Sequence, residues 1–179
     1  MDIKSAQQDV QSTFLHGSVG QFVSGSIWLV SAILGTWVSE RSAILVLVLA
    51  GMFIFPLTQL TLRLLGRPGG LPKGHPMNAL AMQVAFIVPL SLPVIGAASL
   101  YNINWFYPAF MLIVGVHYMP FIFLYGMWEF GALAALLISG GVAFGMLLSD
   151  TFVIGGWFTA IALLLFALLV QFTPRLSKK

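Results

Sequence analysis

Among the side chains in the hydrophobic stretches of this 179-residue chain, that of His117 can take part in the widest range of reactions and contacts. It lies in the middle of a long hydrophobic stretch, where an imidazole can contact a substrate, accept a proton or ligate a metal. The alternative is a neutral ring that hydrogen-bonds a backbone carbonyl or a serine of a neighbouring segment. No second histidine and no carboxylate lies at a comparable place in another hydrophobic stretch. The sequence therefore predicts no metal site.

Further hydrogen-bonding side chains lie toward the ends of the hydrophobic stretches. Gln59 precedes Arg63 by four residues and Tyr125 precedes Glu129 by four, so each pair shares one face of a helix. The residues of the ligand-binding cavity that we expect here are His117, Gln59, Gln83, Tyr125, Arg63, Glu129, Gln21 and Asn78. Arg63 and Glu129 are expected near its mouth, where they can pair. The alternative is that these groups bond one another between helices, or that Arg63 extends to the lipid headgroups.

Motifs for other chemistries are absent from the sequence. The chain has no cysteine, which excludes disulfides, thiolate metal sites and cysteine nucleophiles. It has no His-Glu-x-x-His, no Gly-x-Ser-x-Gly and no phosphate-binding glycine loop, and no pair of carboxylates within a hydrophobic stretch. We therefore predict no catalytic residue and no cofactor. The net charge of +3 lies at the ends of hydrophobic segments, so no nucleic-acid partner is expected.

The composition indicates which elements must position these side chains. Hydrophobic residues make up 59% of the chain and charged residues only 7%, against about 25% charged residues in soluble proteins. Most of the protein surface must therefore contact the lipid bilayer, which is the one partner that the composition predicts. We predict an all-α integral membrane bundle of six transmembrane helices, in one domain over residues 18–172. Its spans are expected at 18–38, 42–65, 76–100, 107–127, 130–149 and 153–172. Residues 1–17 are expected to form an amphipathic or disordered segment, and residues 173–179 a basic tail.

The positive residues predict the orientation of this bundle. With six spans, Lys4, Arg63, Arg67, Lys73 and the basic residues of the tail share one side, and Arg41 stands alone on the other. Positive residues next to membrane helices favour the cytoplasmic side. Both termini are therefore expected in the cytoplasm.

Small residues, prolines and short turns give expectations about packing. The small-residue face of the fifth span consists of Gly131, Ala135, Ser139, Gly141 and Gly145. Such a face lets helices approach closely, within the chain or against a second copy or partner protein. Prolines are expected to interrupt the second, third and fourth spans. The sixth span is almost purely aliphatic and is expected to face lipid, and tight turns predict that the last three spans are successive antiparallel neighbours.

Four stretches of the sequence resemble a known family. They are Gly51–Leu57, the Gly-Arg-x-Gly loop with Lys73–Pro76, Trp105–Ala109 and Leu124–Gly126. Together they resemble an uncharacterised bacterial family of small membrane proteins, known as a domain of unknown function, over most of the chain. The resemblance implies a bacterial cytoplasmic (inner) membrane protein and assigns no activity. In size and number of spans the chain is also similar to the substrate-binding subunits of energy-coupling-factor vitamin transporters, a likeness that assigns no residue.

Three functions remain open on this basis. The leading hypothesis is a protein that binds or transports a small molecule through a cavity in the cytoplasmic half. It rests on the polar residues near the cytoplasmic ends of the spans, on the prolines within the spans and on the lack of a set of catalytic residues. The alternative is a non-transporting sensor or assembly partner. The third is an intramembrane enzyme that uses His117.

Overall fold

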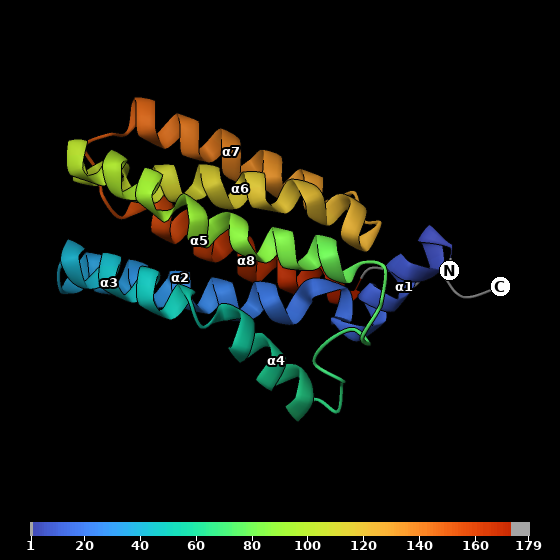
Figure 1. Cartoon of the computed structure of the whole chain (residues 1–179). Helices are drawn as coiled ribbons and strands as arrows, with labels where there is room; N and C mark the ends of the chain where they lie inside the picture. The colour runs from blue at the N-terminus through green and yellow to red at the C-terminus, as the bar shows by residue number, and fades with distance from the viewer. Residues whose placement is uncertain (1, 173–179) are drawn as a thin grey trace.

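The computed structural model describes residues 2–172, and all the regular elements in this part of the chain are helices (Figure 1). In chain order they are α1 (Ile3–Thr13), the 3-10 helix η1 (Leu15–Gly17), α2 (Ser18–Trp37), α3 (Glu40–Gly51), α4 (Ile54–Leu64), α5 (Asn78–Tyr101), η2 (Ile103–Trp105), α6 (Phe106–Tyr125), α7 (Glu129–Leu147) and α8 (Ile154–Phe172). The basic tail predicted at residues 173–179 lies outside the described residues.

Five helices, α2, α5, α6, α7 and α8, are long and apolar enough to cross a membrane. The other predicted span is divided into α3 and α4, which are bent by 58° at Met52 and Phe53. Pro56 explains the break, because it has no N–H to donate to the Met52 carbonyl and its ring crowds that oxygen. The chain is therefore an all-helical protein with five candidate spans, or six if the bent pair crosses as one.

The other prolines in the spans do not divide their helices. Pro89 and Pro93 lie inside α5 and Pro120 lies inside α6, and both helices run continuously through them. The expectation that prolines interrupt three spans is therefore wrong except at Pro56. In a membrane helix, neighbouring side chains and local adjustments can satisfy the backbone groups that a proline frees.

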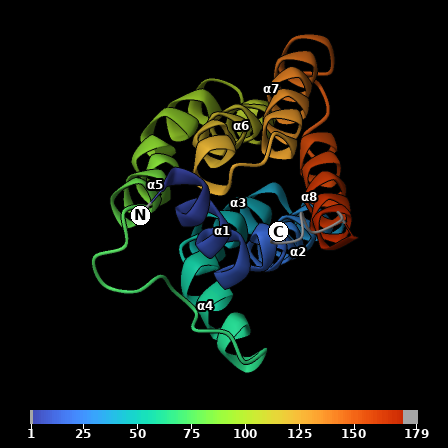
Figure 2. The same cartoon turned by 90° about the vertical axis from the view of Figure 1, so that its right-hand side faces the viewer.

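The helices form two layers that face each other (Figure 2). α2, α3, α4 and α8 make the first layer, and α5, α6 and α7 make the second. Glycines allow close approach within each layer. A Cβ at Gly25 would lie 2.9 Å from Leu164 of α8, and a Cβ at Gly141 would lie 2.9 Å from the Pro108 carbonyl of α6. α8 contacts α7, as expected for successive spans, but it packs chiefly along α2, which the sequence did not predict.

α8 faces protein as well as lipid. Its buried residues include Ala160, Leu163, Phe166, Ala167 and Val170. Its exposed residues include Ile161, Leu165, Leu168 and Leu169. The prediction of a lipid-facing helix is therefore wrong for one face, because an aliphatic side chain suits lipid and a neighbouring helix equally well.

The small-residue face of α7 is divided between α6 and the outer surface. Gly131 lies against Ile122, and a Cβ at Gly145 would lie 3.4 Å from Pro108. Together with Gly141, these glycines pack within the chain. Ala135 and Ser139 are exposed. A contact of this face with a second copy or a partner protein stays a prediction.

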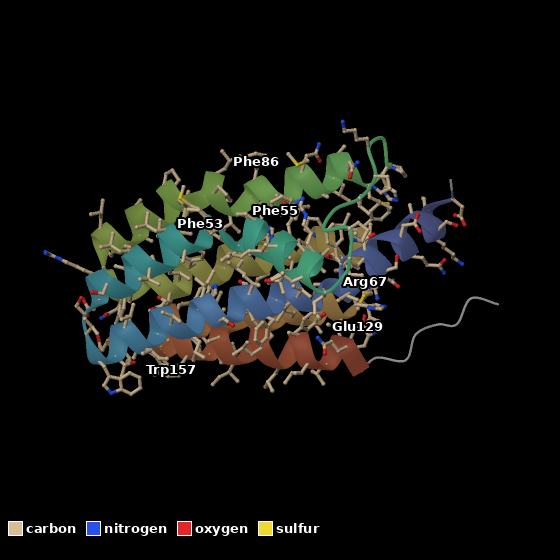
Figure 3. The ribbon with its side chains drawn as sticks, turned by 90° about the horizontal axis from the view of Figure 1, so that it is seen from below. Phe53, Phe55, Arg67, Phe86, Glu129 and Trp157 are labelled. Carbon is tan, nitrogen blue, oxygen red and sulfur yellow. The ribbon has the colours of Figure 1, made fainter. Side chains whose placement is uncertain are left out.

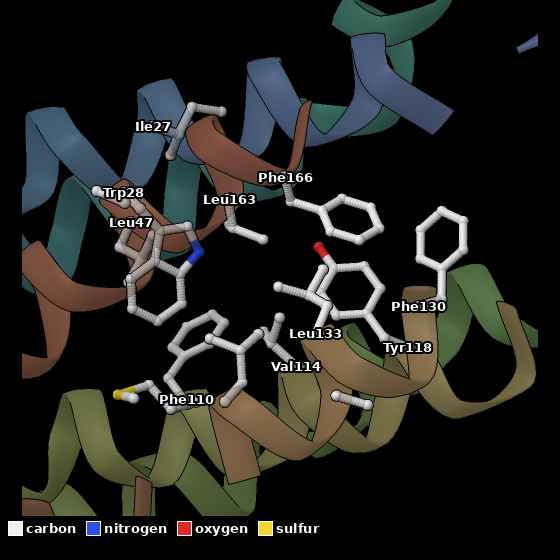
Figure 4. Close-up of a cluster of buried hydrophobic side chains, with 14 of the residues drawn as sticks. Ile27, Trp28, Leu47, Phe110, Val114, Tyr118, Phe130, Leu133, Leu163 and Phe166 are labelled. Atoms are coloured by element: carbon white, nitrogen blue, oxygen red, sulfur yellow. The ribbon is translucent and has the colours of Figure 1, made fainter. Parts of the chain in front are cut away.

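Large aromatic side chains fill the seam between the two layers (Figure 4). Trp28 of α2 is 1% exposed and meets the ring of Phe110 of α6 edge-on, with ring centroids 5.2 Å apart. Trp28 is therefore a packing residue of the seam. Beside it, Ser31 Oγ donates to the Ala43 carbonyl at 2.9 Å. Because that bond uses the one serine proton, the Tyr107 hydroxyl is the donor in its 2.6 Å contact with Ser31 Oγ.

α1 lies across one end of the bundle, as Figure 2 shows. Asp2 caps its first turn by accepting from the Lys4 N–H, and Ala6 and Val10 are buried beneath it. Gln7 donates to the Phe123 carbonyl and Gln11 donates to the Tyr125 carbonyl, both at 2.6 Å. These two amides satisfy carbonyls that the last turn of α6 leaves without helical partners.

Three residues with positive φ join α1 to α2. They are Leu15 at 49°, His16 at 59° and Gly17 at 82°. For a non-glycine residue this region of backbone space costs about 1–3 kcal/mol. The contacts that hold α1 over the end of α6 must offset this strain.

The opposite end of the bundle carries aromatic residues. Trp157 Nε1 donates to Thr36 Oγ1 at 3.0 Å, and its ring meets Trp37 edge-on at 5.9 Å between centroids. Figure 3 places Trp157 at one end of the bundle and Arg67 and Glu129 at the other. Amphipathic rings of this kind suit the headgroup level of a membrane.

Candidate functional site

A hydrogen bond between Gln21 of α2 and Tyr118 of α6 forms the centre of the candidate site. The Tyr118 hydroxyl donates to Gln21 Oε1 at 2.6 Å, and it also has a hydrogen-bonding interaction with Ser24. Gln21 is 3% exposed and Tyr118 is 4% exposed. In Figure 4 the Tyr118 hydroxyl points from α6 into the space between the two layers. The bond therefore crosses the seam within the bundle.

His117 lies beside this bond on α6 and reaches toward α5. Its ring contacts Tyr118 at 5.4 Å and Phe121 at 5.0 Å between centroids, and the imidazole has a backbone hydrogen-bonding interaction with Val84. Its Nδ1 atom is buried and has no hydrogen-bond partner among the described residues. Both alternatives for His117 are therefore met in part. Its Nδ1 is available to a ligand, as the first requires, and the ring also hydrogen-bonds a backbone group, as the second requires.

Thr58 of α4 adds a second buried polar atom at the same level of the bundle. Its Oγ1 has no hydrogen-bond partner in the described part of the chain. A Cβ at Gly20, the residue before Gln21, would lie 3.9 Å from this oxygen. We call Gln21, Ser24, Thr58, His117 and Tyr118 the polar level.

Two of the eight sequence candidates, Gln21 and His117, belong to the polar level. Ser24, Tyr118 and Thr58 were not among the candidates. A tyrosine seven residues before Tyr125, on the same helix face, was a signal for Tyr118. Thr58 had no comparable signal, because a threonine hydroxyl in a helix can donate its hydrogen bond to a backbone carbonyl of the same helix.

Gln59 and Arg63 face the loop after α4 and lie away from the polar level. A Cβ at Gly69 would lie 3.1 Å from Arg63 Cγ and 3.2 Å from the Gln59 carbonyl, and a Cβ at Gly70 would lie 3.9 Å from Gln59 Nε2. Arg63 is exposed, and no ion pair joins it to Glu129. The expected pairing of Arg63 with Glu129 at a cavity mouth is therefore wrong. Arg63 packs against the loop after α4, while Glu129 lies in the first turn of α7.

Three further candidates lie apart from one another. Gln83 is exposed on the outer surface of α5, so it does not face inward as expected. The Asn78 amide donates to the Pro72 carbonyl at 2.8 Å and fixes the start of α5. Tyr125 is buried at the α1 end of the bundle, with its ring stacked on Phe121 at 5.6 Å.

His75 is a buried residue that the sequence candidates did not include. Its Nδ1 accepts the Met77 N–H at 3.2 Å, so a neutral ring carries its proton on Nε2. That nitrogen faces Asp9 Oδ2 of α1 at 3.7 Å. The contact links the loop between α4 and α5 to α1.

No three histidine, cysteine or acidic residues come together as a metal site within residues 2–172. The geometry instead defines an all-helical, multi-pass membrane protein with a polar level inside an aromatic seam. The chain belongs to a family of unknown function, DUF7010, whose model matches residues 3–173. The resemblance to an uncharacterised family is thus confirmed. No curated protein and no solved structure matches the chain.

Proposed function

We propose that the protein binds a small molecule with hydrogen-bonding groups at the polar level and moves it across the membrane. The observation that carries this proposal is the pair of buried atoms without partners, Thr58 Oγ1 and His117 Nδ1, beside the Tyr118–Gln21 hydrogen bond. An unsatisfied buried polar atom costs about 1–3 kcal/mol. A ligand that hydrogen-bonds these atoms removes that cost, so the site favours an occupied state.

The two layers supply the means of movement in this proposal. Glycines hold the helices of each layer close together. Aromatic rings and two tyrosine hydroxyl bonds make most of the contact between the layers, together with the approach of Gly155 and Gly156 of α8 to Tyr107. Two packed bodies of this kind can rock about a shared seam and open it at alternate ends. The absence of charged residues from the polar level suits a neutral, hydrogen-bonding ligand.

The proposed setting is a bacterial inner membrane with both chain termini in the cytoplasm. Lys4, Arg67 and Lys73 lie at the α1 end of the bundle and Arg41 at the other, which follows the positive-inside tendency. A membrane-impermeant maleimide should label Arg41→Cys in intact cells and Arg67→Cys only after permeabilisation. The reverse pattern would overturn the orientation.

Single cysteines test whether water reaches the polar level, because the chain has none of its own. A small charged thiol reagent should label Thr58→Cys and Ser24→Cys in purified protein. Leu137→Cys, in a fully buried apolar position of α7, is the control and should stay unlabelled. Protection at both polar positions would contradict transport through the seam.

Native mass spectrometry tests the ligand itself. Protein released from membranes should retain a non-lipid molecule, and Gln21→Leu should lose it, because a leucine cannot accept the hydrogen bond that the Tyr118 hydroxyl donates to Gln21 Oε1. Retention that is equal in the wild type and Gln21→Leu would remove the polar level from the binding site.

A further inference from the structure

α4 diverges from the rest of the bundle and leaves an apolar face uncovered (Figure 1). The residues exposed by half or more on the bend and on this helix include Phe53, Phe55, Leu60 and Leu64. Figure 3 places Phe53 and Phe55 at the bend and Arg67 beyond the far end of α4. The apolar and cationic parts of this surface therefore follow one another along a single helix.

The end of α4 is built so that it brings cations together. The Arg67 N–H donates to the Leu62 carbonyl and the Gly66 N–H donates to the Arg63 carbonyl, with Gly66 at φ 71°. These two bonds and the left-handed glycine form a Schellman motif. The motif turns the chain back at once, so Arg63 in the last turn and Arg67 just beyond it lie at the same end of the helix.

The loop that follows keeps these cations exposed. Gly69, at φ 74°, packs on the aliphatic stem of Arg63, where a Cβ would lie 3.1 Å from Cγ. Arg63, Arg67 and Lys73 are exposed, and no ion pair or hydrogen bond to their side chains occurs within residues 2–172. Asp9, the acid that contacts this loop, lies 3.7 Å from His75 Nε2 and forms no ion pair with these three cations in the described part of the chain. Three cations thus lack an anionic partner from the described chain.

The length of α4 matches one leaflet of a bilayer. Its 11 residues span about 16 Å at ~1.5 Å per residue. A hydrocarbon core of about 30 Å allots roughly 15 Å to each leaflet. A phospholipid whose phosphate lies at the Schellman turn can therefore place its acyl chains along the exposed face of α4 as far as the bend.

We infer that α4 and the loop of residues 66–75 form a binding site for an anionic phospholipid. Arg63, Arg67 and Lys73 bind its phosphate, and Phe53 and Phe55 contact its acyl chains. A neutral lipid fits the apolar face but leaves the three positive charges uncompensated. The lipid completes the layer at the place where Pro56 turns α4 away from the bundle.

Binding of phosphatidylglycerol to the full chain tests this inference. Native mass spectrometry of protein from phosphatidylcholine nanodiscs, with and without phosphatidylglycerol, should detect retained phosphatidylglycerol in preference to phosphatidylcholine. A basic residue near an anionic membrane contributes about fivefold in binding, so Arg67→Gln should lower the preference about fivefold and R63Q/R67Q/K73Q on the order of a hundredfold. Added inorganic phosphate should not displace the lipid.

Arg41→Gln is the matched control, because Arg41 is an exposed cation at the other end of the bundle. It should leave the preference unchanged. An equal loss in Arg41→Gln, or an unchanged preference in the triple variant, would overturn the site in favour of general attraction to charge. If the triple variant fails to fold, Arg67→Gln decides the question alone, since its side chain is exposed and makes no ion pair within residues 2–172.

Discussion

The contact between α6 and α7 and the seam between the two layers fill space by opposite means. At the α6–α7 contact a Cβ on Gly115 would lie 2.7 Å from Ile138 Cγ1, so there is no room for any side chain. In the seam, Trp28 and Phe110 keep the helices apart with whole rings. Backbone contact fixes two helices as one body, whereas rings with few hydrogen bonds can repack when the bodies move. Rigid layers and an adjustable seam are therefore what the proposed transport function predicts from this difference.

Removal of the largest ring in the seam should have the largest effect. Trp28→Ala should lower the free energy of unfolding by about 3–5 kcal/mol, because the surrounding helices cannot fill the space that an indole leaves. Unfolding in detergent, followed by far-UV circular dichroism, measures the change without relying on tryptophan fluorescence. Trp128→Ala is the matched control at a 73% exposed position and should cost far less. Equal losses would mean that the seam is not tightly packed.

A methyl group at the α6–α7 contact should have the next largest effect. Gly115→Ala should destabilise the protein by about 2 kcal/mol, because its Cβ would meet Ile138 and the Ala134 carbonyl at 3.1 Å. Gly96→Ala is the control on α5, where no atom lies within 4 Å of the added Cβ. Thermal unfolding of the two variants side by side measures the difference. A harmless Gly115→Ala would show that this layer is as adjustable as the seam.

The two tyrosine bonds across the seam should differ from each other. Tyr118→Phe removes the donor to Gln21 and leaves that amide buried, at a cost of about 1–3 kcal/mol. Tyr107→Phe should cost about 1 kcal/mol, because Ser31 still donates to the Ala43 carbonyl. Equilibrium unfolding of both variants makes the comparison. A larger loss for Tyr107→Phe would contradict the assignment of donors.

The smallest effect is expected where α1 covers the end of α6. Gln7→Ala and Gln11→Ala should each cost about 0.6 kcal/mol, the typical value for a hydrogen bond between membrane helices. Hydrogen exchange at the end of α6 should rise in both variants. Gln8→Ala, at an exposed position of the same helix, should change nothing. Unchanged exchange in all three would mean that α1 is not held by these amides.

The sequence predicts the helices well because their length and apolar composition are local properties. Pro56 alone breaks its helix, since the effect of a proline depends on the neighbours that satisfy its freed carbonyl. The polar candidates were chosen by their depth along each span. The depth of a residue does not determine whether its side chain faces the interior of the bundle or its outer surface. Gln21 faces the seam, whereas Gln83 points outward, and nothing in the periodicity of α5 separates its two faces. The α2–α8 pairing joins the two ends of the chain, which no local pattern can indicate.

The hydrogen bonds of α1 connect residues that are far apart in the order of synthesis. Gln7 is synthesised before the Phe123 carbonyl it binds, which lies 116 residues later along the chain. The place of α1 against α6 therefore cannot form until the end of α6 has been made. Docking of α1 at this place thus requires that α2 to α6 have already been synthesised.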